Sequence, residues 1–211
     1  MHLKTSFYVV LISNFALISS CGGGEEGHDA MAEAEPMAET EPAPEPMAAA
    51  AFDLGGGTAT EVHPGQAGSP HVQVAWVVND ANITITYGRP YLNDRVVGES
   101  VPPMSEGFWR LGADEATTLT TDTDVMLGGT HIPAGEYTLW TQYMSDEFHL
   151  IVNSETGQWG TAYNSDHDVA HIAMAVSDLN PPADQLTLSI GDGKLGFEWG
   201  QMASSVELMV H

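Results

Sequence analysis

The sequence predicts an all-β fold, an antiparallel β-sandwich or jelly-roll-like single domain over residues 62–211. Three observations support this prediction. From residue 62 onward the composition shifts toward Val, Ile, Thr, Tyr and Trp. Apolar and polar residues alternate there in short runs, which is the two-residue period of a half-buried strand. Turn-forming Gly, Pro, Asn and Asp residues separate the runs, and about 150 residues suffice for one hydrophobic core.

The first 20 residues have the features of a signal peptide. Lys4 supplies a basic start, residues 7–18 are mostly apolar, and Ser19-Ser20-Cys21 follows closely. Twelve residues are few for a permanent membrane span but suit a cleaved signal. The small residues before the cysteine resemble the lipobox of bacterial lipoproteins, which implies cleavage before Cys21 and acylation of its sulfur and its amino group. An ordinary signal peptide that ends near a cysteine is the alternative.

Cys21 is the only cysteine of the chain, so it cannot form an internal disulfide. Residues 21–61 contain mainly Ala, Glu, Pro, Gly and Met, with no Lys or Arg. Such a segment cannot bury enough apolar surface to fold, so we expect a disordered and extended tether. The predicted location is the cell envelope, with the chain anchored in the outer membrane through Cys21 and facing the periplasm or the cell surface.

Nine runs within the domain are predicted as strands: residues 71–78, 82–88, 117–121, 136–143, 147–152, 171–176, 185–190, 195–199 and 205–210. Turns are predicted between them, at Asn79-Asp80, Gly128-Gly129, Pro133-Ala134-Gly135, Ser145-Asp146, Gly191-Asp192-Gly193 and Ser204-Ser205. Residues 89–109 contain three prolines and no strand pattern. We expect a long ordered loop there, and such loops often carry function.

The domain is strongly acidic. From residue 62 onward, 19 acidic residues face four basic ones, a net charge of −15. Nucleic acid and anionic lipid headgroups are therefore excluded as expected partners. The acidity indicates either a solvated surface, as in a salty habitat, or calcium binding. The fragments at 121–125 and 165–169 lack a complete calcium-loop spacing, so a solvated surface is favoured.

No local motif indicates a reaction, a metal or a cofactor. The chain has no G-x-S-x-G elbow and no glycine-rich phosphate loop before a helix, and no cofactor is expected. His167 and His171 are four residues apart, but on a strand such residues lie about 13 Å from each other. If a metal site existed, Asp166, His167 and Asp168 would be its best candidates. Whether the protein is an enzyme is left open, because active sites can be assembled from distant residues.

The few arginines are clustered. Three of the five Lys and Arg residues of the chain, namely Arg89, Arg95 and Arg110, fall within residues 89–110. An arginine here either packs and pairs inside the protein or binds an anion bidentately.

We assign these two roles to different members of the cluster. Arg110 is expected to stack on Trp109 and to form a structural ion pair with an acid, Glu115 or Asp114. The ligand site is predicted from Arg89 and Arg95 together with the neighbouring Tyr87 and Tyr91.

Four motifs, ITITYGRP (83–90), FWRLGADEATTL (108–119), IPAGEYTLW (132–140) and WGTAYN (159–164), occur in this order. Together they resemble the bacterial domain-of-unknown-function 2911 family over roughly residues 68–210. The resemblance implies an all-β domain outside the cytoplasm, and it transfers no catalytic residue.

The sequence thus predicts a lipid-anchored, extracytoplasmic β-sandwich that acts as a binding or envelope-associated module. Its expected ligand is a small anion or a carbohydrate. The alternatives are a periplasmic or extracellular hydrolase of glycosidase type and a purely structural envelope protein. A deep pocket with paired carboxylates would favour the glycosidase.

Overall fold

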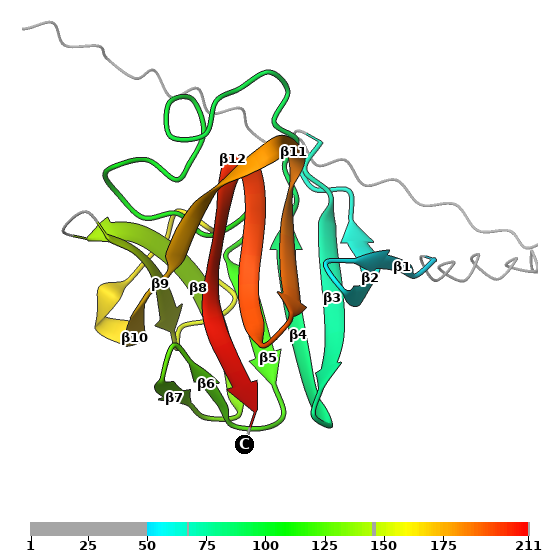
Figure 1. Ribbon diagram of the computed structural model, residues 1–211, viewed down its shortest axis with the longest axis vertical. Helices are drawn as coiled ribbons and strands as arrows, with labels where there is room; N and C mark the ends of the chain where they lie inside the picture. Colours follow the sequence, from blue (N-terminus) through cyan, green and yellow to red (C-terminus); the bar gives the residue numbers. More distant parts are fainter. Residues whose placement is uncertain (1–49, 67, 145–146, 211) are drawn as a thin grey trace, which may run out of the picture. The chain divides into compact units, whose positions relative to one another are not determined.

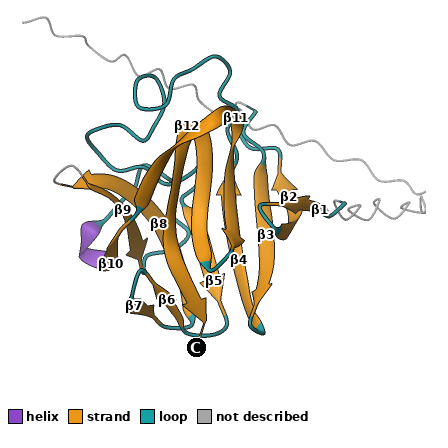
Figure 2. Cartoon of the chain, in the orientation of Figure 1, coloured by secondary structure: helices purple, strands orange, loops and turns teal. Residues whose placement is uncertain are grey.

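Two antiparallel β-sheets form the part of the chain that the computed structural model describes, residues 50–66, 68–144 and 147–210 (Figure 1). The all-β sandwich prediction is confirmed. The one helical element among these residues is a short 3-10 turn, η1 (Ser165–His167), drawn in purple beside β10 in Figure 2. None of the described residues forms a helix with the length and apolar character needed to cross a membrane. The predicted signal peptide, Cys21, the tether up to residue 49 and the turn at residues 145–146 lie outside the described residues.

The larger sheet follows the chain as a meander. It has eight strands, in the order β1 (Phe52–Leu54), β2 (Gly57–His63), β3 (His71–Val78), β4 (Ala81–Gly88), β5 (Thr117–Thr121), β8 (Gly135–Met144), β9 (Glu147–Asn153) and β10 (Asp168–Ala173). Each strand therefore pairs with its nearest neighbour in sequence except where the chain leaves the sheet between β5 and β8. This order differs from the Greek-key connections of a jelly roll.

The smaller sheet contains four strands, in the order β11 (Ala175–Gly191), β12 (Lys194–Val210), β6 (Val125–Leu127) and β7 (Thr130–Ile132). Two tight turns join its hairpins. Gly128 and Gly129 have φ values of 53° and 80°, the left-handed conformation that glycine adopts at little cost. Asp192 and Gly193 form the other turn, with φ values of 49° and 69°.

Two boundaries predicted in this region are wrong. Ser204 and Ser205 do not form a turn, because both lie inside β12 and pair with Val176 and Ala175 of β11. The pairing along the 17-residue strands overrides the local turn preference of serine. The predicted strand 171–176 is also two strands, since the chain passes from the larger to the smaller sheet at Met174.

The core lies between the two sheets, where their inward residues meet. Tyr87 of β4 is fully buried, and its hydroxyl accepts a hydrogen bond of 3.0 Å from the backbone N–H of Leu188 in β11. Burial raises the pKa of this tyrosine above its ordinary value. Phe197 of β12 packs edge-on against Trp109 and Phe148, at ring-centroid distances of 5.7 and 6.0 Å. Tyr87, which the sequence prediction assigned to a ligand site, therefore joins the two sheets inside the core.

The domain begins earlier than residue 62, so the predicted end of the tether is wrong. Residues 52–63 form β1 and β2, and Ala59 pairs with Val74 of β3 with none of its surface exposed. The indole N–H of Trp76 donates to Gly55 O at 2.9 Å. The composition of Gly57–His63 does not reveal this strand, because its first residues are small. Bulky apolar side chains mark a strand in sequence, whereas backbone pairing does not.

This boundary can be tested by placing a charge on each face of β2. Ala59→Lys should lower the free energy of unfolding by about 3 kcal/mol or more, because it buries an unpaired ammonium group in the sheet packing. Thr58→Lys, on the exposed face of the same strand, should change it by no more than about 0.5 kcal/mol. Urea unfolding of the full chain measures both values. Equal stability of the two variants would place β2 outside the folded core.

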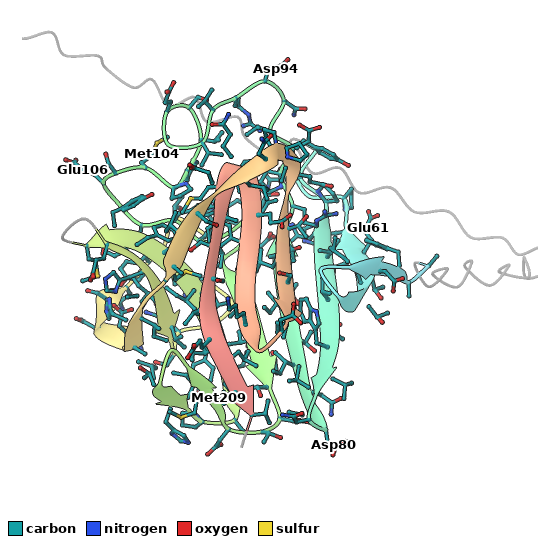
Figure 3. All side chains as sticks on the ribbon, in the orientation of Figure 1. Glu61, Asp80, Asp94, Met104, Glu106 and Met209 are labelled. Carbon is teal, nitrogen blue, oxygen red and sulfur yellow. The ribbon has the colours of Figure 1, made fainter. Side chains whose placement is uncertain are left out.

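The predicted long ordered connection follows β4. Residues 89–116 contain no named strand and run across one end of the sandwich, at the top of Figure 1. Asp94, Met104 and Glu106 mark its outer side in Figure 3. Isolated bridges attach the connection to the sheets, for example Trp109 to Thr141 of β8. The indole N–H of Trp199 also donates to Pro102 O, at 2.8 Å.

Candidate functional site

A strained turn closes the long connection before β5 begins. Leu111 and Asp114 have φ values of 51° and 60°, in the left-handed region that side chains with a Cβ rarely adopt. The indole N–H of Trp109 donates to Gly112 O at 3.1 Å, and the hydroxyl of Thr117 donates to Leu111 O at 3.0 Å. Non-glycine residues keep such a conformation only where the surrounding contacts over-determine it, and such positions cluster at functional sites.

Further bonds hold Asp114. Its Oδ2 accepts from the backbone N–H of Gln66 at 2.7 Å, and its carbonyl accepts from Gly160 N at 3.0 Å. The turn therefore connects three segments that are far apart in sequence, those of Gln66, Asp114 and Gly160.

A cavity of about 660 Å³ lies beside this turn. Five aromatic residues contribute to its walls: Phe108, Trp109, Trp140, Tyr163 and Trp199. Phe108 and Tyr163 stack with ring centroids 3.9 Å apart, and Trp140 is tilted against Tyr163 at 5.1 Å. The volume and the aromatic lining are those of a site for a small organic molecule.

Arg110 contributes positive charge to the cavity wall. Its Nη1 donates to Gly160 O at 3.0 Å, and its Nε is buried with no hydrogen-bond partner among the described residues. Burial lowers the pKa of the guanidinium, and the nearby carboxylates of Asp114 and Glu115 oppose that shift. A buried N–H without a partner is costly, and this one packs against Gly160.

The structural ion pair that the sequence predicted between Arg110 and Glu115 does not form. No contact within 4.0 Å joins Arg110 to an acid in the described part of the chain, and Glu115 contacts His71 instead. The reason is the turn between them, because Arg110 lines the cavity whereas Glu115 contacts His71.

The four predicted ligand residues do not line one cavity, although Arg95 Nη2 donates to Tyr91 O at 2.5 Å. Arg89 braces the connection against β11, because its Nε donates to Leu186 O and its Nη2 to Thr187 Oγ1, each at 3.1 Å. Of the four residues predicted for the ligand site, Arg95 alone lines the cavity. The Nε of Arg95 donates to Leu92 O at 2.9 Å, and among the described residues no ion pair joins Arg95 to an acid.

Tyr91 is the remaining predicted ligand residue. Its side chain is largely exposed, and its backbone forms an isolated bridge with Gln185 of β11. It does not contribute to the cavity wall.

The alternative metal residues do not share a centre either. Asp168 accepts from Asn153 Nδ2 at 2.8 Å and from the Tyr163 hydroxyl at 2.5 Å, and it lies 2.9 Å from His171 Nε2. Asp166 and His167 are exposed in η1. Asp168 thus positions Tyr163 in the cavity wall, and burial together with this carboxylate raises the pKa of the tyrosine.

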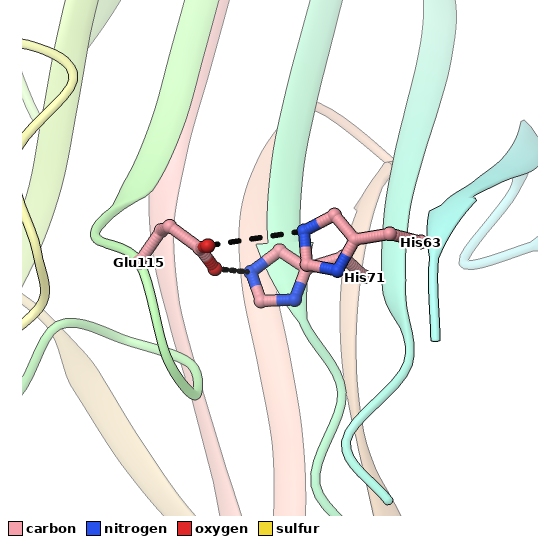
Figure 4. A group of neighbouring side chains, drawn as sticks. All are labelled: His63, His71 and Glu115. Carbon is pink, nitrogen blue, oxygen red and sulfur yellow. Dashed lines mark ion pairs between the residues drawn. The ribbon is translucent and has the colours of Figure 1, made fainter. Parts of the chain in front are cut away.

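The structure also contains a cluster of possible metal ligands that the sequence did not predict. His63, His71 and Glu115 meet beside the turn (Figure 4), and each offers one ligand atom within 4.8 Å of the others. The imidazole rings of the two histidines stack at 4.3 Å with an angle of 16° between their planes. Since His63 and His71 are direct register partners on β2 and β3, recognition of β2 would have revealed the pair.

Burial dominates the electrostatics of His71. It lowers the pKa of the imidazole, His63 lowers it further, and the carboxylate of Glu115 opposes both effects. A lowered pKa favours the neutral ring, which is the form that ligates metals. Gly88 makes room for it, since a Cβ there would lie 2.7 Å from His71 Cε1 and 2.4 Å from Ala113 O.

Substitution of Gly160 tests how tightly the turn is packed. A Cβ at Gly160 would lie 1.8 Å from Arg110 Cδ, so Gly160→Ala should displace the guanidinium and cost about 1–3 kcal/mol of stability. Gly191→Ala adds the same methyl group where nothing lies within 4 Å, and it should change stability by no more than about 0.5 kcal/mol. Thermal unfolding of both variants distinguishes them. A wild-type Tm for Gly160→Ala would contradict the close contact.

Comparison with known proteins identifies the family and nothing closer. No curated protein and no solved structure matches the chain. A family model described as "Protein of unknown function (DUF2911)" matches residues 69–208, which include the turn, most of the cavity wall and two of the three clustered side chains. The resemblance seen in the four sequence motifs is therefore confirmed, and the chain belongs to the DUF2911 family.

Proposed function

We propose that this protein is an extracytoplasmic binding module, held at the cell envelope by lipid on Cys21, whose cavity binds a small ring-bearing organic anion. One observation carries the proposal. Arg95 and Arg110 both line the aromatic cavity, and both donate to backbone carbonyls rather than to an acid among the described residues.

The charge distribution supports an anionic group on the ligand. From residue 62 onward the chain has four basic residues and 19 acidic ones, and two of the four basic residues line this cavity. Neither forms an ion pair within the described residues, since Arg95 and Arg110 donate to backbone carbonyls. Guanidinium groups bind carboxylate or sulfate through two parallel hydrogen bonds. The acidic surroundings repel free anions, so close hydrogen bonds rather than long-range attraction would select the ligand.

The aromatic walls support a ring in the rest of the ligand. Phe108 is half exposed at the cavity and stacks on Tyr163, which Asp168 holds in place. A fixed aromatic face packs against a sugar ring or an aromatic ring and gains from the area that is removed from water. The ligand class that satisfies both features is an acidic sugar or an aromatic acid.

Envelope anchoring rests on the sequence before the described residues. Ser19-Ser20-Cys21 follows an apolar segment, and no other cysteine occurs in the chain. Acyl chains contribute roughly 0.8 kcal/mol for each buried methylene, so several chains hold a protein firmly at a membrane.

The cavity gives the glycosidase alternative little support. A glycosidase needs two carboxylates about 5–10 Å apart. Asp114 is the single acid among the described residues that line the cavity, and it already accepts a hydrogen bond from Gln66 N. The binding experiment must therefore also detect two other outcomes. One is hydrolysis of a bound ligand, and the other is that no ligand binds.

A thermal-shift screen of the full chain against uronic acids, aromatic carboxylates, sulfate and the matching neutral sugars tests the binding function. A ligand that binds the native state raises its Tm. We expect an anion with a ring to raise the Tm, and Arg110→Met to weaken its binding about tenfold or more. Lys194→Met removes an exposed cation outside the cavity and should keep wild-type affinity.

Three outcomes would contradict the binding proposal. Neutral sugars that bind as tightly as their acids would remove the need for the arginines. A folded Arg110→Met variant with unchanged affinity would place the ligand elsewhere. Release of a hydrolysed product would make the protein an enzyme.

The anchor is tested by Cys21→Ser. Loss of the acylated sulfur should move the protein from the membrane fraction to the soluble fraction or leave the precursor uncleaved. Cell fractionation and incorporation of labelled palmitate measure the two effects. A processed serine variant that sediments with membranes like the wild type would rule out lipid anchoring.

A further inference from the structure

The cluster of His63, His71 and Glu115 lies outside the cavity that the proposed function uses. His63 ends β2, His71 begins β3, and Glu115 comes from the strained turn more than forty residues away. The His71 Nε2 and Glu115 Oε2 atoms are 2.8 Å apart, and the His63 Nε2 and Glu115 Oε1 atoms are 3.9 Å apart.

We propose that these three side chains bind a divalent transition-metal ion, for which zinc serves as the probe. Two imidazoles and one carboxylate are a donor set that zinc and other first-row divalent ions accept. Because three protein ligands leave at least one coordination position open, the ion would also be able to hold water or a ligand atom.

Burial brings two of the donor groups close together. His71 is 3 % exposed, and its Nε2 lies 2.8 Å from the buried Oε2 atom of Glu115. The backbone of Ser69 interacts with the same imidazole. A cation between the carboxylate and the rings would replace the direct contact of His71 with Glu115 by coordination of both side chains.

The distances fit a shared ion after small movements. Ligand atoms about 2.1 Å from one metal lie roughly 3.0–3.4 Å from each other, depending on the coordination angle. The separations of 2.8 and 3.9 Å run to different oxygens of Glu115, and one ligand atom from each residue lies within 4.8 Å of the others, so the side chains must draw closer around an ion. The side chains of His63 and Glu115 are 42 % and 46 % exposed, so both have room to adjust around the buried His71.

One existing bond would change when the ion binds. His63 Nδ1 now accepts from the backbone N–H of Gly65 at 3.1 Å. Coordination through Nε2 places the proton on Nδ1, which can then no longer accept that bond. The backbone amide of Gly65 therefore reports directly on metal binding.

The surroundings favour a cation. From residue 62 onward the chain carries a net charge of −15, and an acidic field concentrates cations near the surface. The cluster also adjoins the cavity in sequence, because Asp114, next to Glu115, and Gln66, just beyond His63, line its wall.

The experiment titrates the EDTA-treated full chain with Zn²⁺ by calorimetry, and with Co²⁺ by visible absorption. We expect one saturable site and a shift of the Gly65 amide resonance that accompanies saturation. His63→Gln and Glu115→Gln change partly exposed side chains, and each should weaken the site about tenfold or more while the Tm of the metal-free protein stays close to wild type. These variants are preferred because His71, which is buried, is a riskier residue to replace.

His131→Gln is the matched control. His131 Nε2 contacts Asp124 Oδ2 at 2.9 Å on an exposed surface, so this variant alters a histidine–carboxylate contact of similar length. It should bind zinc like the wild type. Arg110→Met should also keep the metal site, which separates this proposal from the anion cavity.

Three results would overturn the metal site. The first is an absence of saturable zinc binding by the wild-type chain. The second is equal zinc affinity in wild type, His63→Gln and Glu115→Gln, which would assign the binding to other groups such as the acidic residues before residue 50. The third is a Gly65 resonance that does not move at saturation.

Discussion

The hydrogen bond from the Trp109 indole to Gly112 O holds the turn on which both candidate sites depend. Without this bond and the one from Thr117 to Leu111 O, the left-handed conformation of Leu111 would relax. The turn then could not send Arg110 toward the cavity while Glu115 faces His71. Trp109 also packs on Phe197 of β12, so the same side chain joins the site to the core between the sheets. A core residue therefore helps to set the geometry of the polar residues that follow it in the turn.

The two sites have opposite charge, yet they are built from neighbouring residues. Arg110 offers a cation to the aromatic cavity, and Glu115 offers a carboxylate to the histidine pair. Glycines make this proximity possible, since added Cβ atoms at Gly88 and Gly160 would collide with the turn and with Arg110. The rigid meander of the larger sheet supplies the frame, because the turn is connected directly to β5. An anion and a cation bound on either side of one turn would affect each other through it.

The arginines of this acidic domain bond to backbone carbonyls and a hydroxyl group. Arg89 neutralises no acid but donates to Leu186 O and Thr187 Oγ1, and so fastens the long connection to β11. Arg95 and Arg110 likewise donate to backbone carbonyls. From residue 62 onward the chain has 19 acidic residues, so a lack of carboxylates does not explain why these arginines bond to carbonyls. Backbone bonding holds the guanidinium groups in place without neutralising their charge.

Sequence alone determined the fold class, the long connection and most strands of the larger sheet, since alternation in runs such as 71–78 and 82–88 reports directly on a buried face. It missed β1 because three residues are too short a run to show a period, and it missed most of β2 because small residues pair through their backbone without an apolar signature. Only the tertiary structure decided which arginine packs and which faces the cavity, because local sequence does not encode side-chain direction in a strained turn. It also decided that Glu115 meets His63 and His71, since strand register and the turn, rather than spacing along the chain, bring distant ligand atoms together.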